Sequence, residues 1–446
     1  MATADTVAEQ MAGPAMRAWH LAESLSLEHD VRLVSTNRCS VRHDRFEALE
    51  GNSEMIEALV DWCDIFVFQG YILWDHPSIA ASTKVVVADV YDPMHLEQLE
   101  QARPLGEPHW GLFVIGGAAA LNHQLARADY LICASEDQRM FWLGQLAAIG
   151  RIDPELYAED PTYRSFIDVV PFGLADDPPV ATKPAIRGVI DGIGPDDRVL
   201  LWNGGVYNWF DPDTLIRAVH ALVGECPDLR LVFMGMRHPN PDVPDMRAAA
   251  DAIALADELG LTDRHVFFNT EWVPFDQRQN FLLDADIGVS THLAGIETDF
   301  AFRTRILDCL WAGLPVVATE GGALSALVAD RDLGAVVPPR DVDALAAALR
   351  GLLGDADRMA ACRANVGATA KEYRWSEVVQ PLIEFCRHPR RAPDLLNRRT
   401  ATDRRYELGT GFLMRNKALR LVVRRLYLLD QEGWRGLIRR GVRAGR

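Results

Sequence analysis

The chain has 446 residues, of which 49% are hydrophobic, and at about 100–200 residues per domain this length predicts two globular domains. Its seven cysteines are scattered and form no CxxC pair, which favours buried thiols in a reducing compartment over a disulfide framework. No charged and then apolar leader opens the chain, and its longest apolar stretch, 111–121, is too short for a bilayer span of about 20 residues. A cytoplasmic protein is expected.

The formal net charge of −17 hides a strong asymmetry along the chain. Residues 387–446 contain 17 Lys and Arg against 5 Asp and Glu, whereas the remaining 386 residues contain 29 basic and 58 acidic side chains. A body this acidic repels nucleic acid, so nucleic acid is not expected as a partner. The basic tail is the one surface suited to a polyanion.

The first 175 residues alternate short apolar runs with helical stretches such as 15–26 and 136–150. Short buried strands separated by helices predict a parallel, doubly wound sheet. The predicted strands are 31–35, 64–69, 84–89, 130–135 and 168–172. The opening residues, 1–10, are too polar for the buried strand that should precede the first helix. Either the sheet lacks this strand or the true start lies upstream, and we favour a misplaced or truncated start.

A Pro- and charge-rich passage follows, and the alternation then restarts. The predicted strands of this second part are 198–202, 231–235, 265–269, 287–290 and 315–319, and its predicted helices are 212–223, 246–259, 275–283, 302–313 and 342–353. We therefore predict an α/β protein with two Rossmann-like domains and a cleft at the carboxyl ends of both strand sets. The boundaries are 1–175, a linker 176–197, 198–372, a crossover helix 373–390 and a helical tail 391–446.

The segment 287–322 contains the most chemical information. A strand is expected to end at Ser290, and a helix to begin near Phe300, with Arg303 and Arg305 in its first turn and Asp308 about two turns in. Free backbone N–H groups and partial positive charge at a helix N-terminus suit a diphosphate, and two arginines would add charge-assisted hydrogen bonds. A carboxylate such as Asp308 can accept both hydroxyls of a ribose.

This segment resembles family 4 of the retaining GT-B glycosyltransferases, the glycosyl transferases group 1. The family places two glutamates eight residues apart, followed by an Ala-x-Gly-x-Pro-Val-Val-Ala-Thr run, and Trp311–Thr319 (WAGLPVVAT) matches that run. Asp308 falls where the family has its ribose-binding Glu. The sugar-side Glu would fall near Phe300, but the chain has Glu297 three residues earlier, within the variant motif ETDFAFRTRILD.

The resemblance extends to the phosphate-binding turns. Residues 11–26 resemble the family's first glycine loop and helix, and Gly204–Gly205 stand where the second domain's glycine turn is expected. The family usually reads Gly-Arg-Leu in this turn and Lys-Gly four or five residues later, whereas this chain has Gly204–Gly205 and has Phe210 in place of the phosphate-binding Lys. Both of the family's cations, the Arg and the Lys, are therefore absent, and we expect Arg303 and Arg305 to substitute. The donor-binding residues implied are Gly13, Gly204, Gly205, Trp272, Thr298, Asp299, Phe300, Arg303, Arg305 and Asp308. For the arginines the alternative is a surface helix in which they pair with Asp299 or Asp308, for Asp308 it is a local cap or ion pair, and for Glu297 it is an ordinary loop carboxylate.

Other candidates carry weaker signals. Asp92 follows a predicted strand of the first domain and could polarise an acceptor hydroxyl, so Glu297 and Asp92 are the catalytic candidates, with a turn-forming Asp before Pro as the alternative for Asp92. Trp272 could line a nucleotide-base pocket or pack in the core. The Asp-x-Asp pairs 211–213 and 284–286 read better as helix caps than as metal ligands. No cofactor and no metal are expected.

The tail region 411–446 interleaves arginines with Leu, Val, Phe and Trp. A basic amphipathic helix of this kind suits an anionic membrane surface, which would make the protein peripheral on the inner face of the cell membrane. A packed helix with a solvated basic face, or one docked on the acidic body, is the alternative.

The resemblance implies transfer of a sugar from a nucleotide-diphosphate sugar, with retention of configuration, to an acceptor hydroxyl. The acceptor would be an envelope glycan, a lipid-linked sugar or a small-molecule aglycone. Two alternatives stay open: a GT-B nucleotide-sugar epimerase, and a non-catalytic GT-B subunit that scaffolds an active transferase. The sequence leaves the sugar, the nucleotide and the oligomeric state undetermined.

Overall fold

The computed structural model describes residues 1–9, 11–236, 246–270 and 273–396. Its contacts divide the chain into two compact units. Unit 1 contains Met1–Pro171 and the chain from Val378 onward, and unit 2 contains Phe172–Glu377. The predicted tail segment 411–446 and Trp272 lie outside the described residues.

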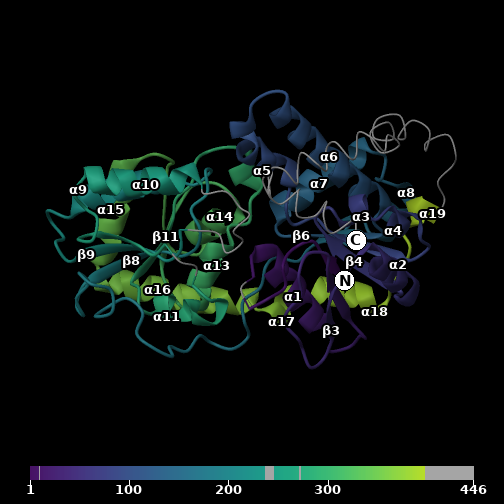
Figure 1. Ribbon diagram of the computed structural model, residues 1–446, viewed down its shortest axis with the longest axis horizontal. Helices are drawn as coiled ribbons and strands as arrows, with labels where there is room; N and C mark the ends of the chain where they lie inside the picture. Colours follow the sequence, from purple (N-terminus) through teal and green to yellow (C-terminus); the bar gives the residue numbers. More distant parts are fainter. Residues whose placement is uncertain (10, 237–245, 271–272, 397–446) are drawn as a thin grey trace, which may run out of the picture. The chain divides into compact units, whose positions relative to one another are not determined.

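Unit 1 is built on a seven-stranded parallel sheet with the order β3-β2-β1-β4-β5-β6-β7 (Figure 1). Its strands are β1 (Ala2–Thr3), β2 (Arg32–Ser35), β3 (Glu47–Glu50), β4 (Ile65–Gln69), β5 (Val85–Asp89), β6 (Tyr130–Cys133) and β7 (Ile167–Val169). The helices between them are α1 (Gly13–Leu25), α2 (Ser53–Trp62), α3 (Ile72–Asp75), α4 (Pro77–Ala81), α5 (Met94–Gln101), α6 (His109–Arg127), α7 (Glu136–Ala148) and α8 (Pro154–Glu159).

The expectation that this sheet lacks its first strand is wrong. Ala2 pairs with Val34 on one side and Phe68 on the other, so β1 lies inside the sheet although it is only two residues long. The Thr3 hydroxyl, fully buried, accepts a hydrogen bond of 2.8 Å from Gln69 Nε2. Two paired residues leave no apolar run for a sequence pattern to detect.

The last described helices, α18 (Gln380–Arg387) and α19 (Pro393–Leu396), belong to unit 1. Arg151, which is fully buried, forms a bidentate ion pair with Asp394 and also donates to the carbonyls of Leu125 and Ala128. The Leu125 and Ala128 carbonyls lie just before β6, at the amino ends of the strands. Buried charges are tolerated when they are paired and hydrogen-bonded, so this cluster fixes the end of the described chain to unit 1.

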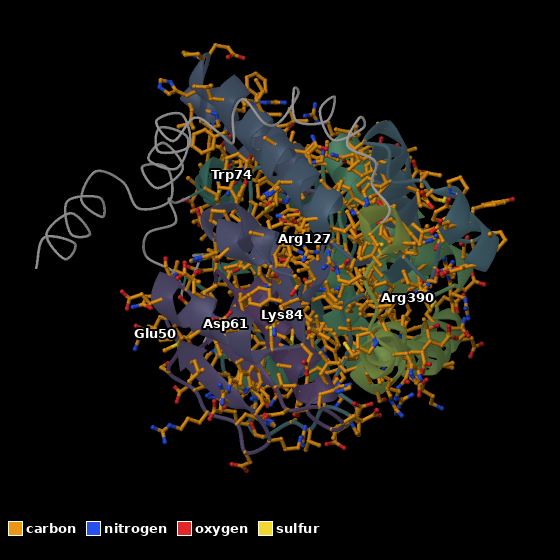
Figure 2. The ribbon with its side chains drawn as sticks, turned by 90° about the vertical axis from the view of Figure 1, so that its right-hand side faces the viewer. Glu50, Asp61, Trp74, Lys84, Arg127 and Arg390 are labelled. Carbon is orange, nitrogen blue, oxygen red and sulfur yellow. The ribbon has the colours of Figure 1, made fainter. Side chains whose placement is uncertain are left out.

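The same edge of unit 1 carries further polar contacts, made by Asp61, Lys84 and Arg127, which are labelled in Figure 2. Lys84 Nζ donates to the Asp61 carbonyl at 3.0 Å, and Arg127 Nη1 bonds the buried Asp129 carboxylate at 2.8 Å. Ion pairs and hydrogen bonds to carbonyl groups thus surround the amino ends of β5 and β6. Gly13, at the start of α1, and Asp92 lie instead at the carboxyl ends of the strands.

Unit 2 contains a six-stranded parallel sheet with the order β10-β9-β8-β11-β12-β13. The strands are β8 (Arg198–Trp202), β9 (Leu229–Phe233), β10 (Val266–Phe268), β11 (Ile287–Ser290), β12 (Val316–Thr319) and β13 (Gly334–Val337). In Figure 1, α9 (Pro212–Leu222), α10 (Arg247–Glu258) and α15 (Val342–Leu353) lie on one side of this sheet, and α11 (Arg278–Leu283) and α16 (Ala356–Ala370) on the other.

The core of unit 2 forms because α9 presents an apolar stripe to the sheet. Leu215, Ile216, Val219 and Leu222 follow helical spacing and are completely buried against strand residues such as Leu231. Asp211 caps this helix, since its carboxylate accepts from Thr214 N at 3.1 Å. The cap interpretation of this Asp-x-Asp pair is therefore confirmed for Asp211.

The predicted helix start near Phe300 is wrong. A single turn, α12 (Ile296–Phe300), ends there, and a separate helix, α13 (Thr304–Trp311), begins four residues later. Arg303 is consequently the residue before α13 rather than part of a continuous helix, and Asp308 lies little more than one turn into it. The helix α14 (Ala323–Asp330) follows β12 after the Gly321–Gly322 turn.

Candidate functional site

The carboxyl edge of the unit 2 sheet gathers the residues of the sequence motif. Gly204–Gly205 follow β8, His292 follows β11, and Gly321–Gly322 follow β12. β8, β11 and β12 are consecutive in the sheet, so these three turns lie on one edge. Gly204 has φ 120°, a value that favours glycine, and it follows Asn203, whose side chain bonds the Arg305 carbonyl at 2.8 Å.

Arg305 brings a buried cation to the Gly204–Gly205 turn. Its Nη2 donates to the Gly205 carbonyl at 2.9 Å, and its guanidinium carbon lies 3.9 Å from the centre of the Phe210 ring and 4.7 Å from that of Trp202. Burial lowers the pKa of Arg305 to about 9, which still leaves the guanidinium charged at neutral pH. The cation lies over the ring of Phe210, the residue found where the resemblance leads us to expect a lysine.

Arg303 and Glu297 form a bidentate ion pair. Arg303 Nη1 donates to Glu297 Oε1 at 3.0 Å, and Nη2 donates to Oε2 at 2.6 Å. The two side chains are 9% and 11% exposed, so the pair is nearly removed from water. Thr298, buried beside them, accepts from Arg303 Nη2 at 3.3 Å and donates its hydroxyl to the Leu293 carbonyl. Arg303 therefore pairs with Glu297, and not with Asp299 or Asp308, the partners expected of an ordinary surface arginine.

His292 is completely buried at the end of β11. Its Nε2 lies 3.0 Å from the Glu320 carbonyl. Burial, followed by the positive charge of Arg303, lowers the pKa of His292 to about 4, so the imidazole is neutral at physiological pH. No sequence motif pointed to this residue.

Buried polar atoms without a hydrogen-bond partner are concentrated at this edge. Within the described part of unit 2, every such side-chain atom belongs to one of five residues: Ser290, His292, Arg303, Arg305 and Ser325. An unsatisfied buried polar group costs about 1–3 kcal/mol, and a bound ligand, ion or water, or a catalytic role, is the usual reason that proteins keep such groups. All five lie within the segment that the sequence motif spans or a few residues beyond it.

The remaining donor candidates are more exposed. Asp308 accepts a hydrogen bond of 3.1 Å from Arg278 Nε, and its side chain is about a third exposed. Asp299 is exposed and Phe300 half-buried at the end of α12. Glu297, Thr298 and Arg303 thus form one hydrogen-bonded group, and Arg303 and Arg305 both lie over the Phe210 ring, whereas Asp308 lies farther along α13.

In unit 1, Gly13 opens α1 and Asp92 lies between β5 and α5, at the carboxyl edge. The same edge contains a buried ion pair, Arg17–Asp89, that the sequence did not indicate. Arg17, fully buried, donates to both oxygens of Asp89 at 2.6 and 2.9 Å and to the Val170 carbonyl at 2.7 Å. The burial of Asp89 raises its pKa, although the Arg17 charge opposes that shift. Nothing in the sequence pattern distinguishes Arg17 from a solvated helix residue.

No group of three or more His, Cys, Asp or Glu side chains suited to a metal ion occurs among the described residues. In the second Asp-x-Asp pair, the Asp284 carboxylate accepts hydrogen bonds from the backbone N–H groups of Ile186 and Arg187, which lie in the predicted linker.

A search of the described helices for a membrane span found none with the length and apolar character that a bilayer requires.

Solved structures share this two-sheet architecture. HepE of Anabaena in complex with UDP-glucose aligns with a TM-score of 0.61 and 15% identity over 86% of this chain and 98% of its own. WaaG, a glycosyltransferase involved in lipopolysaccharide biosynthesis, aligns with a TM-score of 0.60 and 16% identity over 86% and 98%. The fold is therefore GT-B, with two parallel Rossmann-like sheets, as predicted.

Residues 197–355 match the family described as glycosyl transferases group 1. The resemblance seen in the sequence is confirmed. D-inositol 3-phosphate glycosyltransferase of Nocardia farcinica is 29% identical over 234 residues, which are 52% of this chain and 48% of that protein. Phosphatidyl-myo-inositol mannosyltransferase of Mycolicibacterium smegmatis is 27% identical over 194 residues, 43% and 45% of the two chains. The chain spans about half the length of these curated relatives.

Proposed function

We propose that the protein is a retaining glycosyltransferase that moves a sugar from a nucleoside-diphosphate sugar to an acceptor hydroxyl. The observation that supports this most directly is the concentration of unsatisfied buried polar atoms at the carboxyl edge of the unit 2 sheet. The family match covers the same segment. A ligand that brings both anionic oxygens and hydroxyl groups would satisfy these atoms.

The donor diphosphate would be held by Arg305 and the Gly204–Gly205 turn, with the first turn of α13 supplying backbone N–H groups. Charge accumulates on the leaving diphosphate in the transition state, and a buried guanidinium stabilises it in a low-dielectric site. In this scheme the leaving phosphate takes the acceptor proton, so no strong protein nucleophile is required. Asp308 would contact the ribose, and Glu297 a hydroxyl of the sugar.

For the acceptor we propose a lipid-linked or envelope polyol. The curated relatives are named for inositol phosphate and phosphatidyl-inositol, and the basic segment 411–446 is suited to an anionic lipid surface. Asp92 in unit 1 would polarise the acceptor hydroxyl. Inositol 3-phosphate and phosphatidylinositol are therefore the first acceptors to test.

The donor site is tested by substituting Arg305. Arg305→Met removes the buried cation and is expected to lower donor turnover by about 100-fold, the usual effect of losing one preorganised charge-stabilising group. Arg305→Lys keeps a cation and retains more activity. Adding Phe210→Lys to Arg305→Met returns a cation to the same place and is expected to restore part of the lost rate.

The exposed Arg331, which pairs with Glu372, provides the matched control as Arg331→Met. Thermal unfolding of each variant separates loss of fold from loss of function. Equal turnover in the wild type and Arg305→Met, with the fold intact, would contradict the donor assignment. Assays with UDP- and GDP-sugars distinguish the alternatives, because an epimerase converts donor without acceptor, and a scaffold subunit neither binds nor converts it.

A further inference from the structure

His292 is not among the residues proposed to bind the diphosphate. Its side chain is nevertheless fully buried, whereas Glu297, Arg303 and Arg305 each retain some exposure to solvent. Its Nδ1 atom has no hydrogen-bond partner among the described residues. The imidazole adjoins the Gly321 turn: a side chain at position 321 would lie 3.5 Å from Nε2 and would collide with the Thr298 methyl group. Thr298 in turn contacts Arg303.

The hydrogen-bonding character of Nδ1 follows from its surroundings. A carbonyl oxygen can only accept, so the 3.0 Å contact between Nε2 and the Glu320 carbonyl requires the ring hydrogen to be on Nε2. The charged groups that act on the ring are Arg303 and Arg305, and both oppose its protonation. Nδ1 therefore presents a lone pair that accepts a hydrogen bond and cannot donate one.

The unsatisfied atoms of this edge thus differ in kind. Arg303 Nε and Arg305 Nη1 need acceptors, which phosphate oxygens supply, whereas His292 Nδ1 needs a donor, which no phosphate oxygen supplies at neutral pH. Building on the proposed function, we propose that His292 Nδ1 accepts a hydrogen bond from one hydroxyl group of the transferred sugar. His292 is then a specificity-determining residue that selects donors carrying this hydroxyl.

Contact with a sugar requires a neighbouring segment to shift, because Nδ1 is covered. The segment suited to this is α12, a single turn of five residues with no side-chain cap, which rests on the Gly321–Gly322 turn beside the imidazole. Its Thr298 carbonyl approaches the position of a side chain at Gly322. Donor binding would move α12 and bring the sugar against His292.

The test compares dissociation constants rather than rates. Titrations use UDP, UDP-glucose, GDP-mannose, and analogues of the sugar nucleotide that binds, each lacking one sugar hydroxyl. In the wild type, one analogue is expected to bind roughly 10- to 100-fold more weakly than the parent, because it leaves Nδ1 unpaired. His292→Phe is expected to lower the affinity for the parent sugar nucleotide, to show no further loss with that analogue, and to bind the nucleotide alone as the wild type does.

His292→Asn keeps a polar atom near the Nδ1 position and is expected to recover part of the preference. His265→Phe is the matched control, because His265 belongs to the same unit but precedes β10, at the opposite edge of the sheet. If His292→Phe discriminates among the analogues as the wild type does, the inference is wrong and the proposed function stands. If the wild type binds neither nucleotide nor sugar nucleotide, the proposed function fails and the inference with it.

Discussion

The carboxylate of Glu297 binds both Nη atoms of Arg303, close to the place where the donor diphosphate is proposed to bind. Both Nη atoms of Arg303 are taken by the carboxylate, and only Nε remains without a partner. A phosphate group competes for the same guanidinium because it has the same charge sign and a similar bidentate geometry. Donor binding at Arg303 therefore requires the carboxylate to give way, which would free Glu297 for the sugar.

Glu297→Gln is predicted to separate binding from turnover. Without the competing charge, UDP affinity is expected to stay equal or to increase several-fold, whereas turnover is expected to fall by about 100-fold because the carboxylate proposed to contact the sugar is lost. Calorimetric titration with UDP and a donor-turnover assay measure the two effects. Glu372→Gln, at an exposed ion pair, serves as the control. Weaker UDP binding with unchanged turnover would contradict this role for Glu297.

Asp5, after β1, gives the protein a pH-dependent stability. Burial raises the pKa of Asp5 from 3.8 to about 6, so the native state holds this proton more tightly than the unfolded chain does. The contribution is present at acidic pH, and it is lost as the pH rises from about 4 through about 6. Well above pH 6, Asp5→Asn is expected to raise the free energy of unfolding by about 3 kcal/mol, with little gain at pH 4. Urea denaturation at pH 4 and pH 7.5 measures this, and an equal gain at both values would contradict it.

At the scale of elements, helix α13 is held close to strand β11. A side chain at Gly288 would overlap Cys309 Sγ and approach the Leu314 side chain at 3.4 Å. The absent side chain thus lets α13, which carries Arg305, pack directly on the sheet. The WAGLP run supplies Leu314 to the same contact.

Gly288→Ala is predicted to destabilise unit 2 by about 1–3 kcal/mol through overpacking, and to weaken nucleotide binding because α13 shifts. Adding Cys309→Ala removes the clashing sulfur and is expected to recover most of the stability. Thermal unfolding with and without UDP follows both effects. A Gly288→Ala variant as stable as the wild type would show that α13 is not tightly packed here.

At the scale of the whole chain, the basic residues follow a firmly attached segment. Asp394, two residues before the end of the described region, is 6% exposed and pairs with the buried Arg151. Arg391 and the Ala392 backbone both bond Asp129. Residues 391–394 are thus attached to unit 1 by contacts within the described part of the chain.

Two truncations test whether residues 391–394 stabilise unit 1 and residues 397–446 bind the membrane. Removing residues 397–446 is expected to leave the unfolding temperature and donor turnover unchanged, and to abolish binding to anionic vesicles. Ending the chain after Arg387 also removes Asp394, leaves Arg151 as an unpaired buried charge, and is expected to cost about 3–5 kcal/mol. Vesicle sedimentation and thermal unfolding measure these outcomes. Unchanged sedimentation of the first truncation with phosphatidylserine vesicles would remove the membrane proposal.

The sequence by itself determined the doubly wound class and the segment that carries the donor motif, because buried parallel strands are continuous apolar runs and the WAGLPVVAT run is local. It also led to the prediction, still to be tested, that Arg303 and Arg305 supply the positive charge that the family's phosphate-binding Lys provides, because Phe210 stands where that Lys is expected. Local patterns failed where only long-range pairing defines an element: β1 has two residues, and the edge strand β3 (EALE) has no apolar run.

Only the tertiary structure decided which groups are unsatisfied. Arg305 lies over Phe210 although the two are far apart in sequence, and His292 acquires its fixed tautomer from the Glu320 carbonyl. Burial, pairing and pKa depend on neighbours that the fold brings together across strands, and no local spacing encodes them. The fold class could therefore be predicted from periodicity, whereas the roles of Arg303, Arg305 and His292 depend on the packed carboxyl edge of the sheet.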